Sequence, residues 1–370
     1  MYGIILFSCD SGIISVGMVA VMELIEKLDN GLRCSIDWLS FTINSTELYP
    51  TLNDFGFSYS DFYECPKGAN GYKRMVRLHG SNLRVLFDGG DNMGIHFDCS
   101  GSAVSDLIRY FSDTLMVETP FDTLAYDMDL VVIQELLSLI TLNGHISRLD
   151  LAIDNMQNIY YRVPELEEIW NAKRCCCHFK TFKHITERDS SGVLVGDTVY
   201  LGSRTSELMV RVYNKQLEYN KKEPENPIDY EWVRWELELK DARANSAARL
   251  LMQKCSVGSV AVGILANVFR VIVFDDSNKS RCSTDIKWQR FVDGIEQLRL
   301  YVPKSEKTLE DKYRWVQRQV GPTLTGLILA NHGDISWIRN NMPIHAGRMK
   351  SDLRDMVASA NPDWVNVFMT

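Results

Sequence analysis

Three short segments of the chain alternate apolar and polar residues, at 148–154, 209–215 and 234–240. Side chains on a strand point to opposite faces in turn, so this period of two predicts β-strands with one apolar and one polar face. The polar positions collect carboxylates, basic groups and one phenol, namely Arg148, Asp150, Asp154, Arg211, Tyr213, Lys215, Arg234, Glu236, Glu238 and Lys240. This inventory suits metal-assisted attack of a tyrosine on a phosphodiester.

Around these segments the pattern predicts further strands and a larger number of helices. Further strands are expected at 37–43, 74–78, 83–87 and 94–98. Apolar residues at helical spacing predict helices at 48–55, 102–114, 131–140, 163–171, 242–251, 257–268, 287–300 and 308–330. Pro322 is expected to kink or restart the last helix. The predicted fold class is α+β, with a central mainly antiparallel β-sheet flanked by helices and a smaller helical C-terminal region.

Composition and breaks in the pattern suggest the domain organisation. The polar stretch at 276–283 suggests a boundary. Near the start, residues 3–25 are apolar but Asp10, Ser11 and Glu23 interrupt them, so neither a membrane span nor a secretory signal is expected. Four parts are predicted. Residues 1–35 form an N-terminal extension, 36–275 the domain that contains the charged strands, 284–340 a helical C-terminal region and 341–370 a tail.

The bulk composition is that of a globular protein, with 45% hydrophobic and 24% charged residues. The net charge of −8 argues against a surface coated with phosphate contacts but allows a local basic groove. The nine cysteines have no regular spacing, which favours a reducing cytoplasm over a disulfide framework. The chain is therefore expected to be cytoplasmic, with no membrane association.

One locally basic segment is a candidate for phosphate contacts. Its cations include Lys173, Arg174, Lys180 and Lys183, and the alternative is a solvated loop. Arg204, after a glycine and a serine, either positions a DNA backbone or belongs to a simple turn. Within the basic segment, residues 175–178 read Cys-Cys-Cys-His, but no second cluster supplies partners at zinc-site spacing, so a zinc site is not expected.

The charged strands, in this order and spacing, resemble the replication initiation factor family. This family comprises rolling-circle initiators of filamentous phages and small plasmids, with related relaxases of integrative elements. Stretches at 37–41, 94–101, 308–310 and 320–324 are also similar, so the resemblance covers roughly residues 36 to 335. The strongest matches are Ile146-Ser-Arg-Leu-Asp-Leu-Ala-Ile-Asp154, Gly196-Asp-Thr-Val-Tyr-Leu-Gly-Ser-Arg204, Val210-Arg-Val-Tyr-Asn-Lys215 and Trp232-Val-Arg-Trp-Glu-Leu-Glu-Leu-Lys240.

The resemblance implies roles for individual residues. Tyr213 corresponds to the family's nicking nucleophile, and the carboxylates that would hold a divalent metal are Asp150, Glu236, Glu238 and Asp154. Oxygen ligands favour Mg²⁺ or Mn²⁺ over Zn²⁺. Asp150 and Asp154 lie four residues apart, roughly 13 Å on a straight strand, so both cannot bind one ion there.

Two cations flank Tyr213 on its own strand, and other tyrosines are rival nucleophiles. Arg211 and Lys215 are expected to lower the phenol's pKa and to stabilise charge in the transition state. The rivals are Tyr200, interpreted as a packing residue, with Tyr160 and Tyr161. His96 is either a supporting active-site residue or an ordinary hydrogen-bonded histidine.

The predicted activity is site-specific nicking of one origin strand, giving a 5′-phosphotyrosine and a free 3′-OH that primes synthesis, with later rejoining. The expected partners are origin DNA, single-stranded or hairpin at the nick site, and a host helicase and polymerase. A homodimer is left open. The alternatives are a conjugative relaxase of an integrative element, which shares the chemistry, and a non-catalytic DNA-binding regulator.

Overall fold

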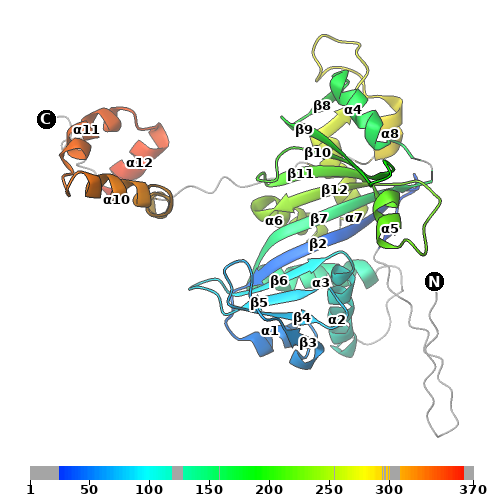
Figure 1. Cartoon of the computed structure of the whole chain (residues 1–370), viewed down its shortest axis with the longest axis horizontal. Helices are drawn as coiled ribbons and strands as arrows, with labels where there is room; N and C mark the ends of the chain where they lie inside the picture. The colour runs from blue at the N-terminus through cyan, green and yellow to red at the C-terminus, as the bar shows by residue number, and fades with distance from the viewer. Residues whose placement is uncertain are drawn as a thin grey trace, which may run out of the picture. The chain divides into compact units, whose positions relative to one another are not determined.

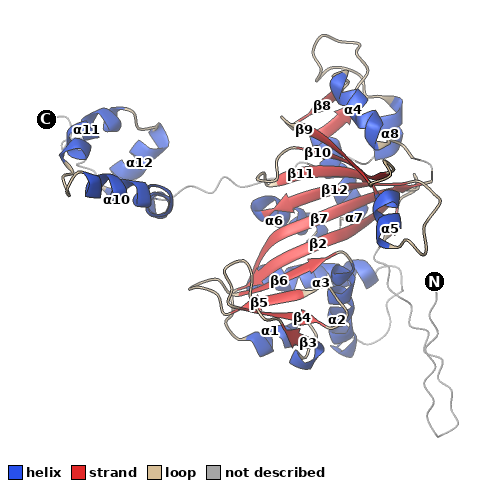
Figure 2. Cartoon of the chain, in the orientation of Figure 1, coloured by secondary structure: helices blue, strands red, loops and turns tan. Residues whose placement is uncertain are grey.

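A computed structural model describes residues 25–118, 128–157, 159–253, 255–293, 295, 297–298, 300 and 309–361 (Figure 1). The chain divides into two compact units, Met1–Val302 and Pro303–Thr370. The described part of the first unit combines a large sheet with helices, and that of the second contains helices alone (Figure 2). Most of the expected N-terminal extension, residues 1–24, lies outside the described residues, as does the end of the expected tail from 362.

One sheet gathers eleven described strands, each antiparallel to its neighbours, which confirms the predicted fold class. The order across the sheet is β3-β4-β5-β6-β2-β7-β12-β11-β10-β9, with β1 paired to β2. A separate two-stranded sheet pairs β8 with β13. The strands are β1 Glu26–Lys27, β2 Arg33–Ile43, β3 Phe62–Glu64, β4 Arg74–Leu78, β5 Arg84–Phe87, β6 Ile95–Ser100, β7 Gly144–Met156, β8 Cys175–Cys177, β9 Phe182–Arg188, β10 Leu194–Leu201, β11 Leu208–Asn214, β12 Trp232–Lys240 and β13 Phe269–Val271.

Helices of the first unit cover the apolar face of this sheet. Helices α3, α6 and α7 contact β7, and α2 contacts β2 and β6. Their apolar residues join Leu151 and Trp235 of the strands in one continuous core. A 3-10 turn spans Tyr59–Asp61. The helices are α1 Leu48–Asp54, α2 Ser102–Glu118, α3 Met128–Asn143, α4 Val163–Asn171, α5 Lys215–Lys222, α6 Asp241–Met252, α7 Val257–Val268 and α8 Ile286–Val292.

Side-chain caps and one bridging amide fix several helices to the strands. Asn214, the last residue of β11, accepts a hydrogen bond from the Leu217 amide and so starts α5 directly after the strand. Asn245 of α6 bonds both the backbone amide and the carbonyl of Ile146 in β7. These contacts hold the ends of the charged strands in place. In the first unit, α8 lies in the segment expected to begin the C-terminal region, and its Trp288 belongs to the core.

The described part of the second unit is a series of short helices. A π-helical turn, Val316–Val320, interrupts the predicted helix directly before Pro322, which lies in the first turn of α10 as expected of a restarting proline. Two helices occupy part of the segment predicted as a polar tail. The helices are α9 Leu309–Trp315, α10 Gly321–Ala330, α11 Ser336–Gly347 and α12 Ser351–Ala360. Across the described residues of the whole chain, none of the helices has the length and apolar character needed to cross a membrane.

Candidate active site

The three charged strands are adjacent in the sheet, in the order β7-β12-β11, with β10 and β9 beyond. Directly opposite residues on antiparallel neighbours share a face, so the polar side chains form rows that cross the strands. We name three rows after one member each. The Tyr200 row is Lys183-Tyr200-Arg211-Glu236, the Tyr213 row is Ile185-Thr198-Tyr213-Arg234-Asp154, and the Asp150 row is Met209-Glu238-Asp150.

Tyr213 meets a carboxylate and a guanidinium at one oxygen atom. Its hydroxyl donates a hydrogen bond to Glu236 Oε2 at 3.4 Å, and Arg211 Nη2 reaches the same oxygen at 2.6 Å. The Arg211 guanidinium also lies over the Tyr213 ring, 4.4 Å from its centroid. The phenol, the carboxylate and the guanidinium therefore form one connected group on neighbouring strands.

The Tyr213 side chain is only 5% exposed, and this burial decides its acidity. Burial raises the pKa of the Tyr213 hydroxyl well above its usual value, the nearby Arg234 and Arg211 lower it, and Glu236 raises it. The net direction is upward, because burial outweighs the lowering effect that was expected of Arg211. Lys215 is engaged elsewhere, because its Nζ forms an ion pair with Glu218 Oε2 at 2.7 Å.

Asp150 is fully buried and shares an arginine with Glu238. Arg148 bonds both oxygens of Asp150 and reaches Glu238 Oε2 at 3.2 Å. The same guanidinium stacks on the Trp38 ring, 3.9 Å from the centroid. Burial raises the pKa of the Asp150 carboxyl to about 7, against the opposing effect of Arg148. Burial likewise raises the pKa of Glu236.

Asp154 belongs to a separate cluster further along β7. Its two oxygens accept hydrogen bonds from Arg234 at 2.7 and 2.8 Å, and Oδ1 also accepts one from the Trp232 indole at 2.6 Å. Arg234 bonds Asp37 with its remaining nitrogen. The structure therefore brings Asp150 and Glu238 together, places Glu236 beside Tyr213, and engages Asp154 elsewhere.

The chemistry of these donors fits a hard divalent cation, although arginines stand between them. Carboxylate oxygens are the ligands that Mg²⁺ and Mn²⁺ take in proteins. Burial raises the pKa of Asp150 and of Glu236 against the opposing effects of Arg148 and Arg211. Among the residues that the structure describes, no three His, Cys, Asp or Glu side chains converge as a metal site.

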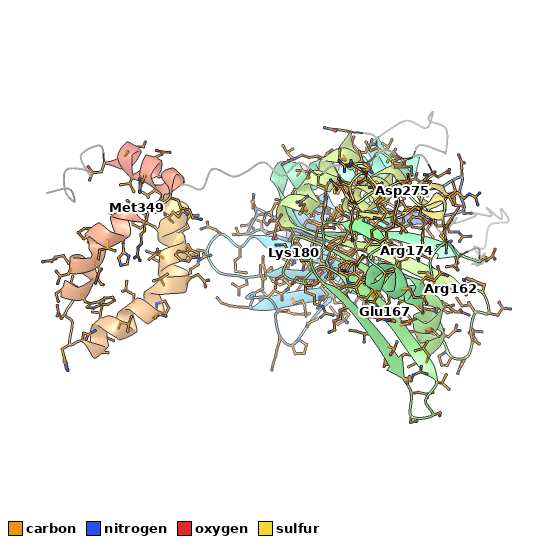
Figure 3. All side chains as sticks on the ribbon, turned by 90° about the horizontal axis from the view of Figure 1, so that it is seen from above. Arg162, Glu167, Arg174, Lys180, Asp275 and Met349 are labelled. Atoms are coloured by element: carbon orange, nitrogen blue, oxygen red, sulfur yellow. The ribbon has the colours of Figure 1, made fainter. Side chains whose placement is uncertain are left out.

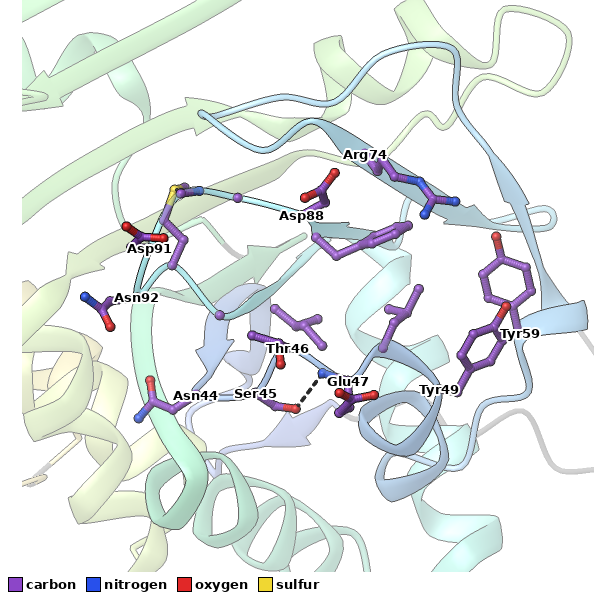
Figure 4. A pocket seen from close by; sticks show the side chains of 17 residues that line it. Asn44, Ser45, Thr46, Glu47, Tyr49, Tyr59, Arg74, Asp88, Asp91 and Asn92 are labelled. Carbon is purple, nitrogen blue, oxygen red and sulfur yellow. Dashed lines mark hydrogen bonds between the residues drawn. The ribbon is translucent and has the colours of Figure 1, made fainter.

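A hollow of ≈ 380 Å³ opens on the polar face over parts of the Tyr200 and Asp150 rows. It is lined by Trp38, Arg148, Tyr200, Arg204, Met209, Arg211, Glu236, Glu238 and Lys240. A larger hollow, of ≈ 1150 Å³, lies in the other half of the sheet beside β4, β5 and β6 (Figure 4). Glu47, Asp88 and Asp91 line it, and it contains none of the predicted catalytic residues.

The predicted DNA-binding residues separate into two places. Lys183 stands directly opposite Tyr200, and Arg204 lines the ≈ 380 Å³ hollow, so both lie at the polar face. Lys173 and Arg174 follow α4, and Lys173 instead lines a hollow of ≈ 510 Å³ with the three consecutive cysteines. Lys180 lies between β8 and β9, and both Lys180 and Arg174, which are labelled in Figure 3, are exposed.

The rival tyrosines and His96 also have definite places. Tyr161 is buried in the apolar core against Trp235, and Tyr160 donates to the Asn30 carbonyl at 3.4 Å, so neither is in the site. Tyr200 is half-buried and lines the hollow, whereas the sequence suggested a packing role. His96 forms a hydrogen bond with Thr42 at 2.9 Å, away from Tyr213.

Comparison with known proteins agrees with this architecture. The family model described as replication initiation factor matches residues 144–339, more than half of the chain. The chain therefore belongs to the replication initiation factor family, as the sequence motifs suggested. The matched residues contain all three rows of the polar face.

One curated protein and one solved structure give more particular likenesses. NicK of Bacillus subtilis (strain 168), a candidate DNA relaxase, is 26% identical over 351 residues, covering 93% of this chain and 90% of NicK. The structure of a rolling-circle replication initiator protein from Geobacillus stearothermophilus aligns with a TM-score of 0.59 at 24% identity. That alignment covers 74% of this chain and 99% of the initiator chain, and it supports the fold.

Proposed function

We propose that this chain starts rolling-circle replication by nicking one strand of origin DNA with Tyr213. The observation that carries the proposal is the meeting of the Tyr213 hydroxyl, Glu236 and Arg211 at one carboxylate oxygen. Membership of the replication initiation factor family and the similarity to NicK support DNA as the substrate. The presence of the tyrosine and the carboxylates on one face argues against a non-catalytic regulator.

The reaction transfers one phosphate without a change in the number of bonds. The Tyr213 oxygen attacks phosphorus, the bond from phosphorus to the 3′-oxygen breaks, and the products are a 5′-phosphotyrosine and a 3′-OH. The hydroxyl proton passes to the Glu236 oxygen to which it is already hydrogen-bonded, and a proton from solvent water goes to the 3′-oxygen as it leaves. Arg211 lies beside the same oxygen and would stabilise negative charge that develops on the phosphate. The retained bond energy allows the strand to be rejoined.

A divalent cation would supply the remaining electrostatic stabilisation. The residues that would hold it are Asp150, Glu236 and Glu238, and Asp154 is set apart because it lies with Arg234 and Trp232 in a separate cluster. Arg148 and Arg211, which bond these three carboxylates, would have to release them to the cation. When bound, Mg²⁺ or Mn²⁺ would polarise a phosphate oxygen. EDTA is therefore expected to abolish nicking of plasmid DNA and either ion to restore it; nicking that persists in EDTA would contradict this part.

The decisive experiment compares two tyrosine variants on a supercoiled plasmid that carries the chain's own origin. Tyr213→Phe should neither relax the plasmid nor form a covalent adduct with a 3′-labelled strand on a denaturing gel. Tyr160→Phe is the matched control, because this hydroxyl bonds a backbone carbonyl outside the site, and it should act like the parent protein. Adducts formed by Tyr213→Phe at the parent level would overturn the proposal.

The similarity to NicK over 93% of the chain favours one second candidate function, DNA relaxation for transfer of an integrative element. Both functions use the same nick, so the cleaved DNA decides between them. Autonomous replication of a plasmid carrying the cleaved site, given only this chain and host helicase and polymerase, supports the initiator. A requirement for conjugation machinery supports the relaxase.

A further inference from the structure

Tyr200 occupies a position on the polar face that the proposed chemistry does not use. It stands opposite Arg211 on one side and opposite Lys183 on the other, in the Tyr200 row. Its ring is half-buried and lines the ≈ 380 Å³ hollow together with Arg211 and Glu236. Tyr213, by contrast, is sealed within its row at 5% exposure and is not among the lining residues.

Arg204 is held over the Tyr200 ring by the loop that follows β10. Gly202 has φ +93°, a left-handed conformation that side chains disfavour, and it turns the chain back toward the strand. Lys240 then donates a hydrogen bond to the Arg204 carbonyl at 2.5 Å, which anchors the loop. As a result the Arg204 guanidinium lies 5.5 Å from the Tyr200 ring centroid while its side chain stays exposed.

The cations beside Tyr200 differ from the other cations of the polar face. Arg148, Arg211, Arg234, Lys215 and Lys240 each form a salt bridge with a carboxylate. Among the described residues, neither Arg204 nor Lys183 has a carboxylate within salt-bridge distance. Both are exposed, so they can bind phosphate without first giving up a partner.

We propose that Tyr200 stacks on the base of the nucleotide next to the cleaved phosphate, with Arg204 and Lys183 on its flanking phosphates. This inference rests on the proposed nicking function. Tyr200 and Tyr213 lie on adjacent strands two residues out of register, so their Cα atoms are roughly 8 Å apart. One unstacked nucleotide spans that separation, which places its base over Tyr200 when its phosphate reaches Tyr213.

Stacking on an aromatic ring tolerates any base, because every base presents a π-face. The Tyr200 position therefore supplies affinity and alignment for a melted strand, and it supplies no sequence readout. A duplex does not offer an unstacked base, so the inferred ligand is single-stranded DNA.

The test uses two fluorescein-labelled ten-nucleotide probes in EDTA, where cleavage does not interfere. One is oligo(dT), and the other has the same phosphates with abasic sugars. The parent protein should bind oligo(dT) about 10-fold more tightly than the abasic probe. Tyr200→Ala and Tyr200→Leu should remove this preference, whereas Tyr200→Phe should keep it. Arg204→Ala should weaken binding of both probes.

Three results would overturn the inference. The parent protein could bind both probes equally, or Tyr200→Leu could keep the preference while folded by circular dichroism. Alternatively, Tyr200→Phe could lose the preference for oligo(dT) as fully as Tyr200→Leu does. That result would mean that the Tyr200 hydroxyl, and not stacking on its ring, gives the preference. Tyr49→Ala is the control, since Tyr49 is an exposed tyrosine of α1 beside the ≈ 1150 Å³ hollow and should leave the preference intact. These binding measurements do not depend on nicking. If Tyr213 is not the nucleophile, the plasmid experiment shows it independently of them.

Discussion

The two faces of β7, β12 and β11 both contain fully buried side chains, yet they are built from opposite chemistry. On one face Trp235, Leu237 and Leu151 join the continuous apolar core under the helices. On the other face Asp150, Asp154 and Glu236 are buried to a similar degree, with arginines packed between them. Burial of apolar groups stabilises the fold, whereas burial of charges costs desolvation energy that pairing only partly returns.

This difference indicates that the polar face is maintained for function. Core-like packing of the same strands would need no arginine network, and replacing buried ion pairs by apolar residues is often neutral or stabilising. The raised pKa values of Asp150 and Glu236 agree with this cost, since burial opposes their ionised forms. Substitutions on the two faces should therefore have effects of different physical origin.

The largest effect is expected on the apolar face, at Trp235. Its side chain is fully buried against Trp288, Phe291 and Tyr161, so Trp235→Ala should lower the free energy of unfolding by about 3–5 kcal/mol. Urea denaturation followed by circular dichroism measures this. Trp315→Ala is the control, because Trp315 is 58% exposed, and it should change stability by no more than about 0.5 kcal/mol. Equal effects at the two tryptophans would contradict the described core.

The alternation of residues was enough to predict this apolar face and most of the elements around it. Strand β4 and helices α4 and α7 fall where the pattern of apolar residues placed them, and β7 contains the predicted strand and extends beyond it at both ends. Strand β9 was missed, because Phe182–Arg188 is largely exposed and carries charges on both sides. Helix α5 was missed as well, since its residues are polar and only the Asn214 cap marks its start.

The sequence was enough to predict which residues lie on the polar face, but not which of them contact one another. Alternation showed that Asp150, Glu236 and Tyr213 face the same way, and the resemblance suggested their roles. It could not show that β12 lies between β7 and β11, which decides that Glu236 reaches Tyr213 while Glu238 reaches Arg148. Nor could it weigh burial against neighbouring cations, and for Tyr213 burial raises the pKa on balance.

A second prediction concerns Asp154, whose carboxylate neutralises the buried Arg234. Asp154→Asn should lower the free energy of unfolding by about 3 kcal/mol, because Arg234 would keep only Asp37 as a charged partner. Chemical denaturation in EDTA measures the change. Glu64→Gln breaks the exposed pair with Arg74 and should leave the unfolding midpoint unchanged. If Asp154→Asn unfolds at the same denaturant concentration as the parent protein, this cluster does not stabilise the polar face.

The pH dependence of stability should report the uncompensated charge of Asp150. Burial raises the pKa of this carboxyl to about 7 in the folded protein, so the folded state binds its proton more tightly than the unfolded chain does. The contribution to stability is therefore greatest at acidic pH and falls as the pH rises from about 4 toward 7. Relative to Asp150→Asn, the parent should lose about 2 kcal/mol between pH 5 and pH 8 in EDTA. Parallel pH profiles of the two proteins would show that Asp150 is already compensated.

The smallest expected effect separates Lys183, on the polar face, from Lys180, which lies between β8 and β9. The net charge of −8 requires DNA to bind through a confined basic groove, so affinity for oligo(dT) should fall as salt rises. Lys183→Ala should reduce the slope of log affinity against log salt by about 0.7, the value for one phosphate contact on a single strand. Lys180→Ala should leave the slope unchanged, although the two residues lie only three positions apart in one basic segment. If the slope changes equally in both variants, the bound DNA strand lies along the edge of the sheet instead of across its polar face.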